Sequence, residues 1–492
     1  MSQALFFGLG CLLTAAFEPA GLWPLAPALL LPFFYVCLTG SGRRAAQHAF
    51  CFGCGLFLCG TYWIYLSVTG PGQGPWWIGA LLVILLTLIM ASYLAATAWL
   101  IQRFCREHHW RLLLIAPASW TLLEWLRGWL FSGFPWMSLG YAEIDTALAG
   151  WAPVLGVYGV TLLLVFSSAA ALLAILKRGR QRGLAVGLLL LPWISGAALT
   201  QVAWTAASGA HIRTTVLQAG VGQERKWLPE EREPTKQFYR AASRAAVDSR
   251  LVVWPEVAIP SVTDREQDYI ASLQGIAMRN KQAIVFGILE REFLANGDAK
   301  IYNSVLLLKD NTRQVYRKRH LVPFGEYFPV PATVREWLRM MNLPFSDITP
   351  GADAQELLSL ADGTQLAVAI CYEDSYGAEM LAAFPEASIL INVSNDGWFG
   401  DSIAPHQHLQ IARMRSLETG RFTVRATNTG VSAFIDASGR LLQAGGQFEA
   451  LQMTADIEPR SGLTPYARYG NGPVIGLCVL ILAAFWLRSR AS

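Results

Sequence analysis

Three side chains in the second half of the chain, Glu256, Lys318 and Cys371, have the chemistry of acyl transfer. A cysteine thiol has an ordinary pKa near ~8.5, so at neutral pH it needs a base beside it before it can attack a carbonyl carbon. A carboxylate becomes a better base when it is desolvated, and an ammonium group favours the thiolate and stabilises the oxyanion that the attack creates. Together the three groups make a coherent apparatus for acyl transfer.

Short apolar segments are expected to position these groups. The segment Leu366–Ile370 is typical of a buried strand, and Cys371 follows it directly, at the end of the strand where open α/β sheets place their ligand crevices. A second predicted strand, Leu251–Trp254, delivers Glu256 behind a proline and supplies a dry setting for the carboxylate. The lysine lies in a third segment, in which a second carboxylate, Glu326, follows after a turn.

Each feature also has a simpler interpretation. A lone cysteine after a strand is more often a small core residue than a nucleophile. His320, two residues after the lysine, leaves a Cys–His arrangement open. His406 and His408 resemble a metal pair, but two histidines two positions apart on a helix point to different faces. Because no further ligand cluster is visible, we expect neither a metal nor a cofactor.

The cysteines separate into two groups. Seven lie in or beside apolar runs, where Cys51 and Cys54 are interpreted as helix-packing residues, and Cys371 alone lies in the long polar segment. If that segment faces an oxidising compartment, Cys371 has no cysteine partner within its domain. A reactive nucleophile requires a thiol that is free in this way.

The composition indicates a membrane protein. The 492 residues are 53% hydrophobic and only 15% charged, and a net charge of +4 does not suggest a nucleic-acid partner. Most apolar runs have the length that a helix needs to cross a hydrocarbon core roughly 30 Å thick. The runs lie at about 4–17, 22–38, 50–68, 76–101, 112–131, 154–176, 184–204 and 474–487. No basic residue precedes the first run, so we expect an uncleaved anchor rather than a signal peptide.

The basic residues predict the orientation of these runs. They fall on alternate connections and on the C-terminal tail, while the other short connections, 18–21, 70–75 and 132–150, contain no Lys or Arg. The positive-inside rule then gives eight spans with both termini cytoplasmic and residues 209–468 outside the cytoplasm. Within the fifth run, Glu124 and Arg127 lie one helical turn apart, and we interpret them as a self-neutralising pair rather than as substrate contacts.

Residues 209–468 alternate strand and helix patterns, so we expect one large α/β domain with buried strands covered by helices. The predicted strands are 212–218, 251–254, 283–289, 304–308, 366–370, 389–393 and 431–435, and the predicted helices are 234–247, 264–281 and 406–419. The expected domains are a membrane domain at 1–207, a catalytic domain at 208–469, and a last span with its tail at 470–492.

The Glu–Lys–Cys set resembles that of the nitrilase superfamily of carbon–nitrogen hydrolases. Four longer segments resemble one membrane-bound family of that superfamily, the apolipoprotein N-acyltransferases. These segments are Glu124–Trp136 (EWLRGWLFSGFPW), Tyr316–Glu326 (YRKRHLVPFGE), Ser394–Gly400 (SNDGWFG) and Leu463–Arg468 (LTPYAR). The resemblance covers nearly the whole chain. It implies eight membrane helices joined to a nitrilase-like α-β-β-α sandwich on the periplasmic face of the bacterial inner membrane.

The resemblance also assigns roles. It makes Glu256 the general base, Lys318 the cation that stabilises the oxyanion, and Cys371 the nucleophile, which carries a fatty acyl group as a thioester. The implied donor is a phospholipid, phosphatidylethanolamine in particular, and the implied acceptor is the α-amine of a diacylglyceryl-cysteine at the N-terminus of an apolipoprotein. We expect a monomer. The supporting residues that it implies are Tyr372, whose N–H would be a second oxyanion donor, Glu373, Glu326, Asn303, Trp227 and Trp398.

There is a physical reason why such a catalytic domain should be anchored to the membrane. Exposing a fatty chain of roughly 16 carbons to water costs on the order of 10 kcal/mol, at about 0.8 kcal/mol per methylene, so the chain must reach the thiol along an apolar path. Two stretches could line that path: 334–345, which is either a core helix or an arm that touches the membrane, and a predicted exposed turn with Trp398 and Phe399. Two other hypotheses remain open, a membrane-anchored amidase or nitrilase and a sensor or scaffold on a degenerate nitrilase fold.

Overall fold

The computed structural model describes residues 2–295, 297–327 and 348–491. The chain divides into two compact units. One comprises Met1–Tyr65, Trp76–Ala203 and Thr464–Ser492, and the other comprises Leu66–Pro75 and Trp204–Leu463. The predicted stretch 334–345 lies outside the residues that the structure describes, so its role stays a prediction.

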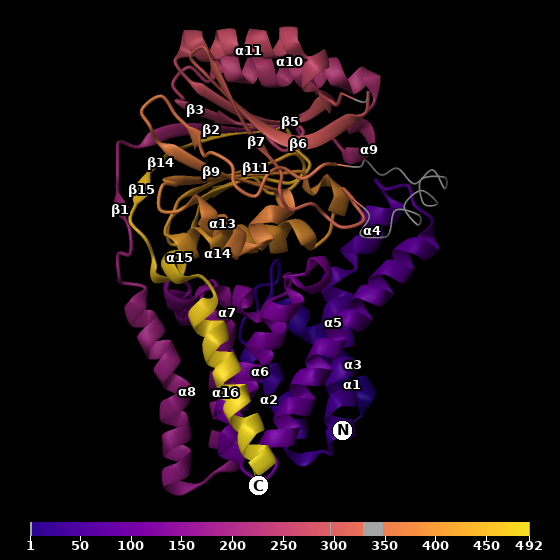
Figure 1. Cartoon of the computed structure of the whole chain (residues 1–492), viewed down its shortest axis with the longest axis vertical. Coiled ribbons are helices and arrows are strands. Elements are labelled where there is room, and N and C mark those ends of the chain that lie inside the picture. Colours follow the sequence, from indigo (N-terminus) through magenta and orange to yellow (C-terminus); the bar gives the residue numbers. More distant parts are fainter. Residues whose placement is uncertain (1, 296, 328–347, 492) are drawn as a thin grey trace. The chain divides into compact units, whose positions relative to one another are not determined.

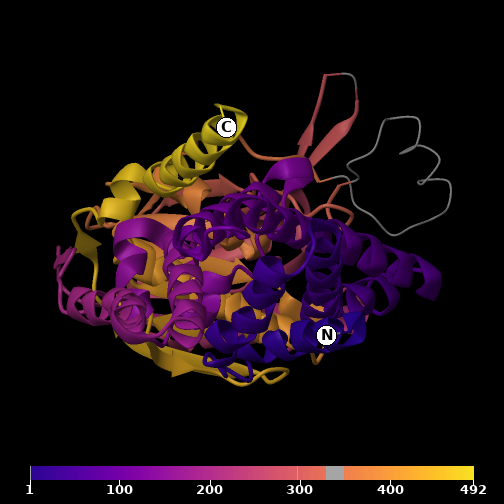
Figure 2. The ribbon, with the colours of Figure 1, turned by 90° about the horizontal axis from the view of Figure 1, so that it is seen from below.

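The first unit consists of apolar helices, several of which are seen nearly end-on in Figure 2. Its main helices are α1 (Gln3–Leu13), α2 (Leu25–Thr39), α3 (Gly42–Thr61), α5 (Trp76–Cys105), α6 (Leu112–Arg127), α7 (Ala152–Leu176), α8 (Gly179–Leu199) and α16 (Gly472–Ala491). Each of the eight apolar runs of the sequence overlaps one of these helices. Two shorter helices, α4 (Trp63–Thr69) and α15 (Pro465–Tyr469), follow α3 and precede α16 along the chain.

Fewer than eight of these helices have the dimensions of a membrane span. Among the described residues, 4 helices are long and apolar enough, and the number is 5 if the pair α3 and α4, bent by 48°, counts as one span. The helices α1 and α2 have 11 and 15 residues, short of the roughly 20 that a spanning helix needs. The apolar helices fit a membrane protein, and the count of eight crossings stays a prediction.

The pair Glu124 and Arg127 lies buried inside the first unit. The Arg127 Nη2 atom lies 3.8 Å from Glu124 Oε2, and Arg127 Nη1 also donates to the carbonyl oxygen of Trp136 at 2.8 Å. Glu124 accepts from the Thr161 hydroxyl at 2.7 Å and from the Leu139 N–H at 3.2 Å. These contacts tie α6 to the irregular segment that follows it, which favours the structural interpretation of the pair.

The second unit contains two larger β-sheets among its described residues (Figure 1). The first sheet has the order β14 (Leu451–Ile457), β2 (Ile212–Gln218), β3 (Leu251–Val253), β5 (Ala283–Phe293), β6 (Ala299–Lys309) and β7 (Thr312–Arg317), and β4 (Ile259–Val262) pairs with β5. The second has the order β13 (Leu441–Ala444), β12 (Ala433–Ile435), β11 (Thr423–Thr427), β10 (Ile389–Ser394), β9 (Gln365–Ile370) and β8 (Leu358–Ser359). The short strands β1 (Ala206–Ala207) and β15 (Arg460–Ser461) pair separately.

Side chains alternate between the two faces of each sheet and so build separate cores. On β2, Val216 joins the core between the sheets, whereas Leu217 joins the core beneath α10 (Pro229–Ala245) and α11 (Gln267–Asn280). On the other sheet, the outer face packs against α13 (Gly377–Met380) and α14 (Ala404–Thr419). Figure 1 shows the resulting order of layers, α-β-β-α. The sandwich predicted for this part of the chain is confirmed.

Each predicted strand and helix of this unit overlaps an observed one, and β2 agrees at both ends. The strands that the sequence analysis missed include β7, β11 and β14. They carry charged or hydroxyl side chains among the apolar ones, as in Thr423-Val-Arg-Ala-Thr427, so they contain no continuous apolar run.

Candidate active site

Cys371 begins the short 3-10 turn Cys371–Ser375, labelled η7, immediately after β9. Its backbone has φ +53°, in the left-handed region that a residue with a Cβ seldom adopts. Such a conformation persists where the surrounding structure fixes it, and it recurs at active sites. The sharp change of direction ends the strand and places the thiol at its carboxyl end, with 7% of the residue exposed.

Lys318 follows β7, and its N–H donates to the carbonyl oxygen of Asn303 on β6 at 2.8 Å. Its Nζ atom lies 2.8 Å from Glu326 Oε2 and 3.6 Å from Glu256 Oε1. Burial disfavours the ammonium, but the two carboxylates outweigh it and raise the pKa of Lys318 above its ordinary value. The lysine is therefore a permanent cation.

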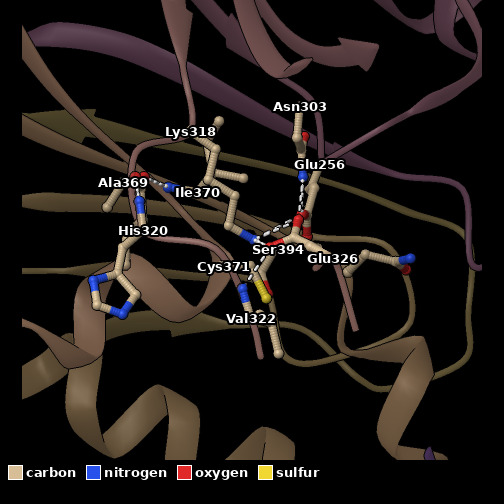
Figure 3. Close-up of polar contacts among 12 residues, drawn as sticks. Glu256, Asn303, Lys318, His320, Val322, Glu326, Ala369, Ile370, Cys371 and Ser394 are labelled. Atoms are coloured by element: carbon tan, nitrogen blue, oxygen red, sulfur yellow. Dashed lines mark hydrogen bonds and ion pairs between the residues drawn. The ribbon is translucent and has the colours of Figure 1, made fainter. Parts of the chain in front are cut away.

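Asn303 links the two carboxylates of the site. Its Nδ2 group donates to Glu256 Oε1 at 2.7 Å and to Glu326 Oε1 at 3.0 Å. Glu326 is held further by the N–H of Val322 at 2.8 Å. Figure 3 shows these contacts meeting at the two carboxylates, both of which also pair with the Lys318 amine, so the predicted Glu256, Lys318, Asn303 and Glu326 form one cluster of hydrogen bonds and ion pairs.

The sulfur of Cys371 lies beside this cluster (Figure 3). Burial raises the pKa of the thiol above its ordinary value, the Glu256 and Asp396 carboxylates raise it further, and Lys318 opposes them. At neutral pH the thiol therefore keeps its proton, and to act as a nucleophile it would need a base beside it. Glu256 is the carboxylate of the cluster whose charge raises the pKa of this thiol.

Glu373 holds the turn of Cys371 in place. One of its oxygens accepts from the N–H of Ile370 at 2.7 Å, and the other accepts from the N–H of Arg319 at 2.7 Å and of His320 at 3.2 Å. The Tyr316 hydroxyl donates to the same carboxylate at 3.1 Å. One buried side chain therefore ties the end of β9 to the segment that carries Lys318.

His320 is directed away from the thiol. Its ring stacks on Tyr376 with the centroids 3.6 Å apart, and its Nδ1 atom lies 2.8 Å from Glu379 Oε1. Figure 3 shows the ring turned away from Cys371. The geometry disfavours the Cys–His arrangement that the sequence left open.

The other predicted supporting residues lie outside the polar cluster. Trp227 follows the short helix α9 (Gln223–Lys226) and is 49% exposed. Trp398 lies in the 3-10 turn η9 (Asp396–Phe399), which ends at Gly400 with φ +56°, and is 36% exposed. Tyr372 follows Cys371 and is buried, with its ring edge-on to Tyr376. The role of the Tyr372 backbone N–H as a hydrogen-bond donor to the oxyanion stays a prediction.

Sequence reasoning missed several buried charged groups near the site. Lys226 donates to the carbonyl oxygen of Glu256 at 3.2 Å; burial lowers its pKa to about 8, against the effect of the Glu256 carboxylate. Asp374, Asp396 and Arg425 form ion pairs behind Cys371. The sequence did contain a signal for Asp396. This residue comes just after β10, as Cys371 comes just after β9, and the carboxyl ends of these two parallel neighbouring strands lie at the same edge of the sheet.

Two family models match the chain. Residues 9–170 match the apolipoprotein N-acyltransferase N-terminal domain, and residues 197–466 match the carbon–nitrogen hydrolase domain. An amidase from Nesterenkonia sp. of known structure is 17% identical over 54% of this chain and 96% of that chain, with a TM-score of 0.37.

Curated relatives match over almost the full length. The apolipoprotein N-acyltransferase of Methylococcus capsulatus is 41% identical over 98% of this chain and 95% of its own. That of Nitrosomonas europaea is 39% identical over 97% of this chain and 95% of its own. Two adjoining family matches and full-length relatives at this identity lead to one conclusion: the chain belongs to the apolipoprotein N-acyltransferase family.

Proposed function

We propose that this acyltransferase moves a fatty acyl chain from a phospholipid to the α-amine of the diacylglyceryl-cysteine of an apolipoprotein, in two steps through a thioester on Cys371. The observation that carries the proposal is the Lys318 ammonium, held between Glu256 and Glu326 beside the thiol. Phosphatidylethanolamine is the proposed donor.

In the first step, Glu256 accepts the thiol proton while the sulfur of Cys371 bonds to the carbonyl carbon of the donor ester. The oxyanion that forms lies against the Lys318 ammonium and the N–H of Tyr372. When this intermediate collapses, the ester C–O bond breaks. The leaving lysophospholipid oxygen takes the proton from Glu256, so the enzyme is left as the thioester with its base regenerated.

In the second step, the neutral α-amine of the acceptor attacks the thioester carbon. Glu256 accepts a proton from the nitrogen, the C–N bond forms, and the C–S bond breaks. The proton then returns to sulfur, which restores the resting thiol. Glu326 and Asn303 stay in place throughout and hold the side chains of Lys318 and Glu256 in their positions relative to each other.

Mass spectrometry of the detergent-solubilised full chain tests both steps. Phosphatidylethanolamine alone should add one acyl mass to the peptide that contains Cys371, and a diacylated lipopeptide should then remove it and become N-acylated. Cys371→Ser should carry no adduct, whereas Cys54→Ser, a matched control in the first unit, should behave like the unsubstituted enzyme. Release of free fatty acid in place of the N-acylated lipopeptide would contradict the transferase and favour a hydrolase.

We also propose the finer topology: eight crossings, both termini in the cytoplasm, and the catalytic domain at 208–469 in the periplasm, between a membrane domain at 1–207 and a last span with its tail at 470–492. The alternation between connections that carry Lys or Arg and connections that carry neither supports it. An impermeant maleimide should label Asn311→Cys from the periplasmic side of intact cells and Arg180→Cys only after lysis. The reverse pattern would contradict the orientation. Light scattering of the detergent complex should give the mass of a monomer.

A further inference from the structure

Four buried ionisable side chains form a closed cluster behind Cys371. They are Asp374 in η7, Asp396 in η9, His408 in α14 and Arg425 in β11, and each side chain is at most 2% exposed. Arg425 lies 2.8 Å from Asp396 Oδ2 and 3.5 Å from Asp374 Oδ2. The proposed two-step reaction uses none of these groups. Taking four ionisable side chains out of water costs free energy, so we expect them to have a role in the fold or in the site.

The contacts of His408 define its charge. Its Nδ1 atom lies 2.9 Å from Asp396 Oδ1, and its Nε2 atom lies 3.0 Å from Asp374 Oδ1 and 3.2 Å from the carbonyl oxygen of Cys371. Acceptors therefore face both ring nitrogens, and only the imidazolium carries a proton on each. With His408 as imidazolium, the cluster holds two positive and two negative charges and is neutral overall.

The charged groups that face the ring act in opposite directions. Burial and the Arg425 guanidinium disfavour the imidazolium, but the Asp374 and Asp396 carboxylates outweigh them and raise the pKa of His408 to about 9. His406, two residues earlier on the same helix, faces Gln447 instead, with its Nε2 atom 3.3 Å from Gln447 Nε2.

Ser394 connects this cluster to the nucleophile. Its hydroxyl donates to Asp396 Oδ1 at 2.8 Å and is also in hydrogen-bonding contact with the Cys371 side chain, beside which it lies in Figure 3. A hydroxyl has one proton to donate. When the thiol loses its proton, the Ser394 hydroxyl can turn from Asp396 to the sulfur, because Asp396 keeps His408 on one oxygen and Arg425 on the other.

We propose that His408, as an imidazolium, is a positioning residue for Cys371. It offsets the negative charge of Asp396, frees the Ser394 hydroxyl to stabilise the thiolate, and holds the Cys371 carbonyl so that the left-handed turn keeps the sulfur in place. The inference rests on the proposed function, in which Cys371 is the nucleophile.

The test measures how fast iodoacetamide alkylates the peptide that contains Cys371 in the full-length enzyme, as a function of pH. His408→Gln removes the imidazolium charge and leaves the cluster net negative, so the midpoint of alkylation should move up by about one pH unit. His406→Gln is the same change on the same helix and should leave the midpoint where it is. The double variant His408→Gln, Asp396→Asn restores neutrality and should bring the midpoint back down.

Ser394→Ala keeps the cluster and removes the hydroxyl, so it should also raise the midpoint. If His408→Gln folds and its midpoint equals that of the unsubstituted enzyme, the inference is wrong. If His408→Gln does not fold, Ser394→Ala decides, and an unchanged midpoint there overturns the proposal.

The acyl adduct keeps the two proposals apart. Failure of the unsubstituted enzyme to form an adduct at Cys371 with phospholipid would refute the proposed function. An adduct that forms at the same rate, with the same pH dependence, in His408→Gln would instead refute the role of His408.

Discussion

The Nζ atom of Lys318 lies 3.6 Å from Oε1 of Glu256, although the two residues follow different strands of the same sheet. At this distance the ammonium and the carboxylate attract each other. In the proposed mechanism they serve as the cation and the base, opposite a thiol delivered by the other sheet.

Replacing Lys318 with methionine should slow formation of the acyl-enzyme by at least about 100-fold, because the oxyanion loses its cation. The two carboxylates, Glu256 and Glu326, would also face each other without a counter-charge. The rate is measured as acyl mass on Cys371 against time. Lys300→Met changes an exposed lysine and should have no effect. A Lys318→Met enzyme with an unchanged rate would remove the lysine from the mechanism.

Asn303→Asp should abolish most of the activity while preserving the size of the side chain. The amide donates to both Glu256 and Glu326, and a carboxylate there would place a third negative group between them. We expect a loss of about 100-fold in single-turnover acylation. Asn311→Asp makes the same change at an exposed position and should be neutral. Near-normal acylation by Asn303→Asp would mean that the hydrogen bonds of Asn303 do not control how Glu256 acts as a base.

Glu373→Gln should destabilise the catalytic unit and misplace the nucleophile. The carboxylate accepts three backbone N–H groups, and an amide would turn a donor toward at least one of them. The free energy of unfolding should fall by about 2–4 kcal/mol, measured in denaturant. Glu386→Gln makes the same change at an exposed position and should leave the free energy of unfolding unchanged. Equal stability of the two variants would show that Glu373 does not anchor the turn.

His408 should make stability depend on pH in the alkaline range. Its pKa rises from 6.5 to about 9 on folding, so its contribution is complete below pH 6.5 and is lost as the pH rises through 9. The melting temperature of the unsubstituted enzyme, relative to that of His408→Gln, should therefore fall by a few degrees between pH 7 and pH 10. A constant difference across this range would contradict an imidazolium at this position.

Lys226 should change the pH dependence of stability in the opposite direction to His408. Its pKa falls from 10.5 to about 8 on folding, so its ammonium costs stability below pH 8 and the cost disappears as the pH rises toward 10.5. In Lys226→Met this gain is absent, and the melting temperature should decline more steeply with alkaline pH than in the unsubstituted enzyme. If the melting temperatures of the two proteins changed in parallel with pH, the pKa of Lys226 would be the same in the folded and unfolded chains, and burial would not lower it.

The sequence predicted the layers and the reactive side chains of the catalytic unit because both depend on local patterns. Continuous apolar runs such as Leu366–Ile370 identify strands covered on both faces. Residues placed just after such runs, Glu256 and Cys371 among them, lie near one another because the ends of the strands converge.

The remaining features depend on contacts between distant segments. The cluster of Asp374, Asp396, His408 and Arg425 is assembled from four elements, and no spacing in the chain relates His408 to Cys371. The strand β11 was missed because Arg425 interrupts its apolar pattern, and that arginine is buried only because two aspartates meet it. Partners of this kind become visible only in three dimensions.

Because Glu256 and Lys318 belong to one sheet and Cys371 to the other, the reacting groups straddle the apolar layer between the sheets. Sliding of one sheet over the other by about 1 Å would separate base from nucleophile, and misplacement on that scale can cost about 100-fold in rate. In the proposed mechanism, side chains such as Val216, deep between the sheets, thus set the distance between the base and the nucleophile. Trimming them should lower turnover even where the protein still folds.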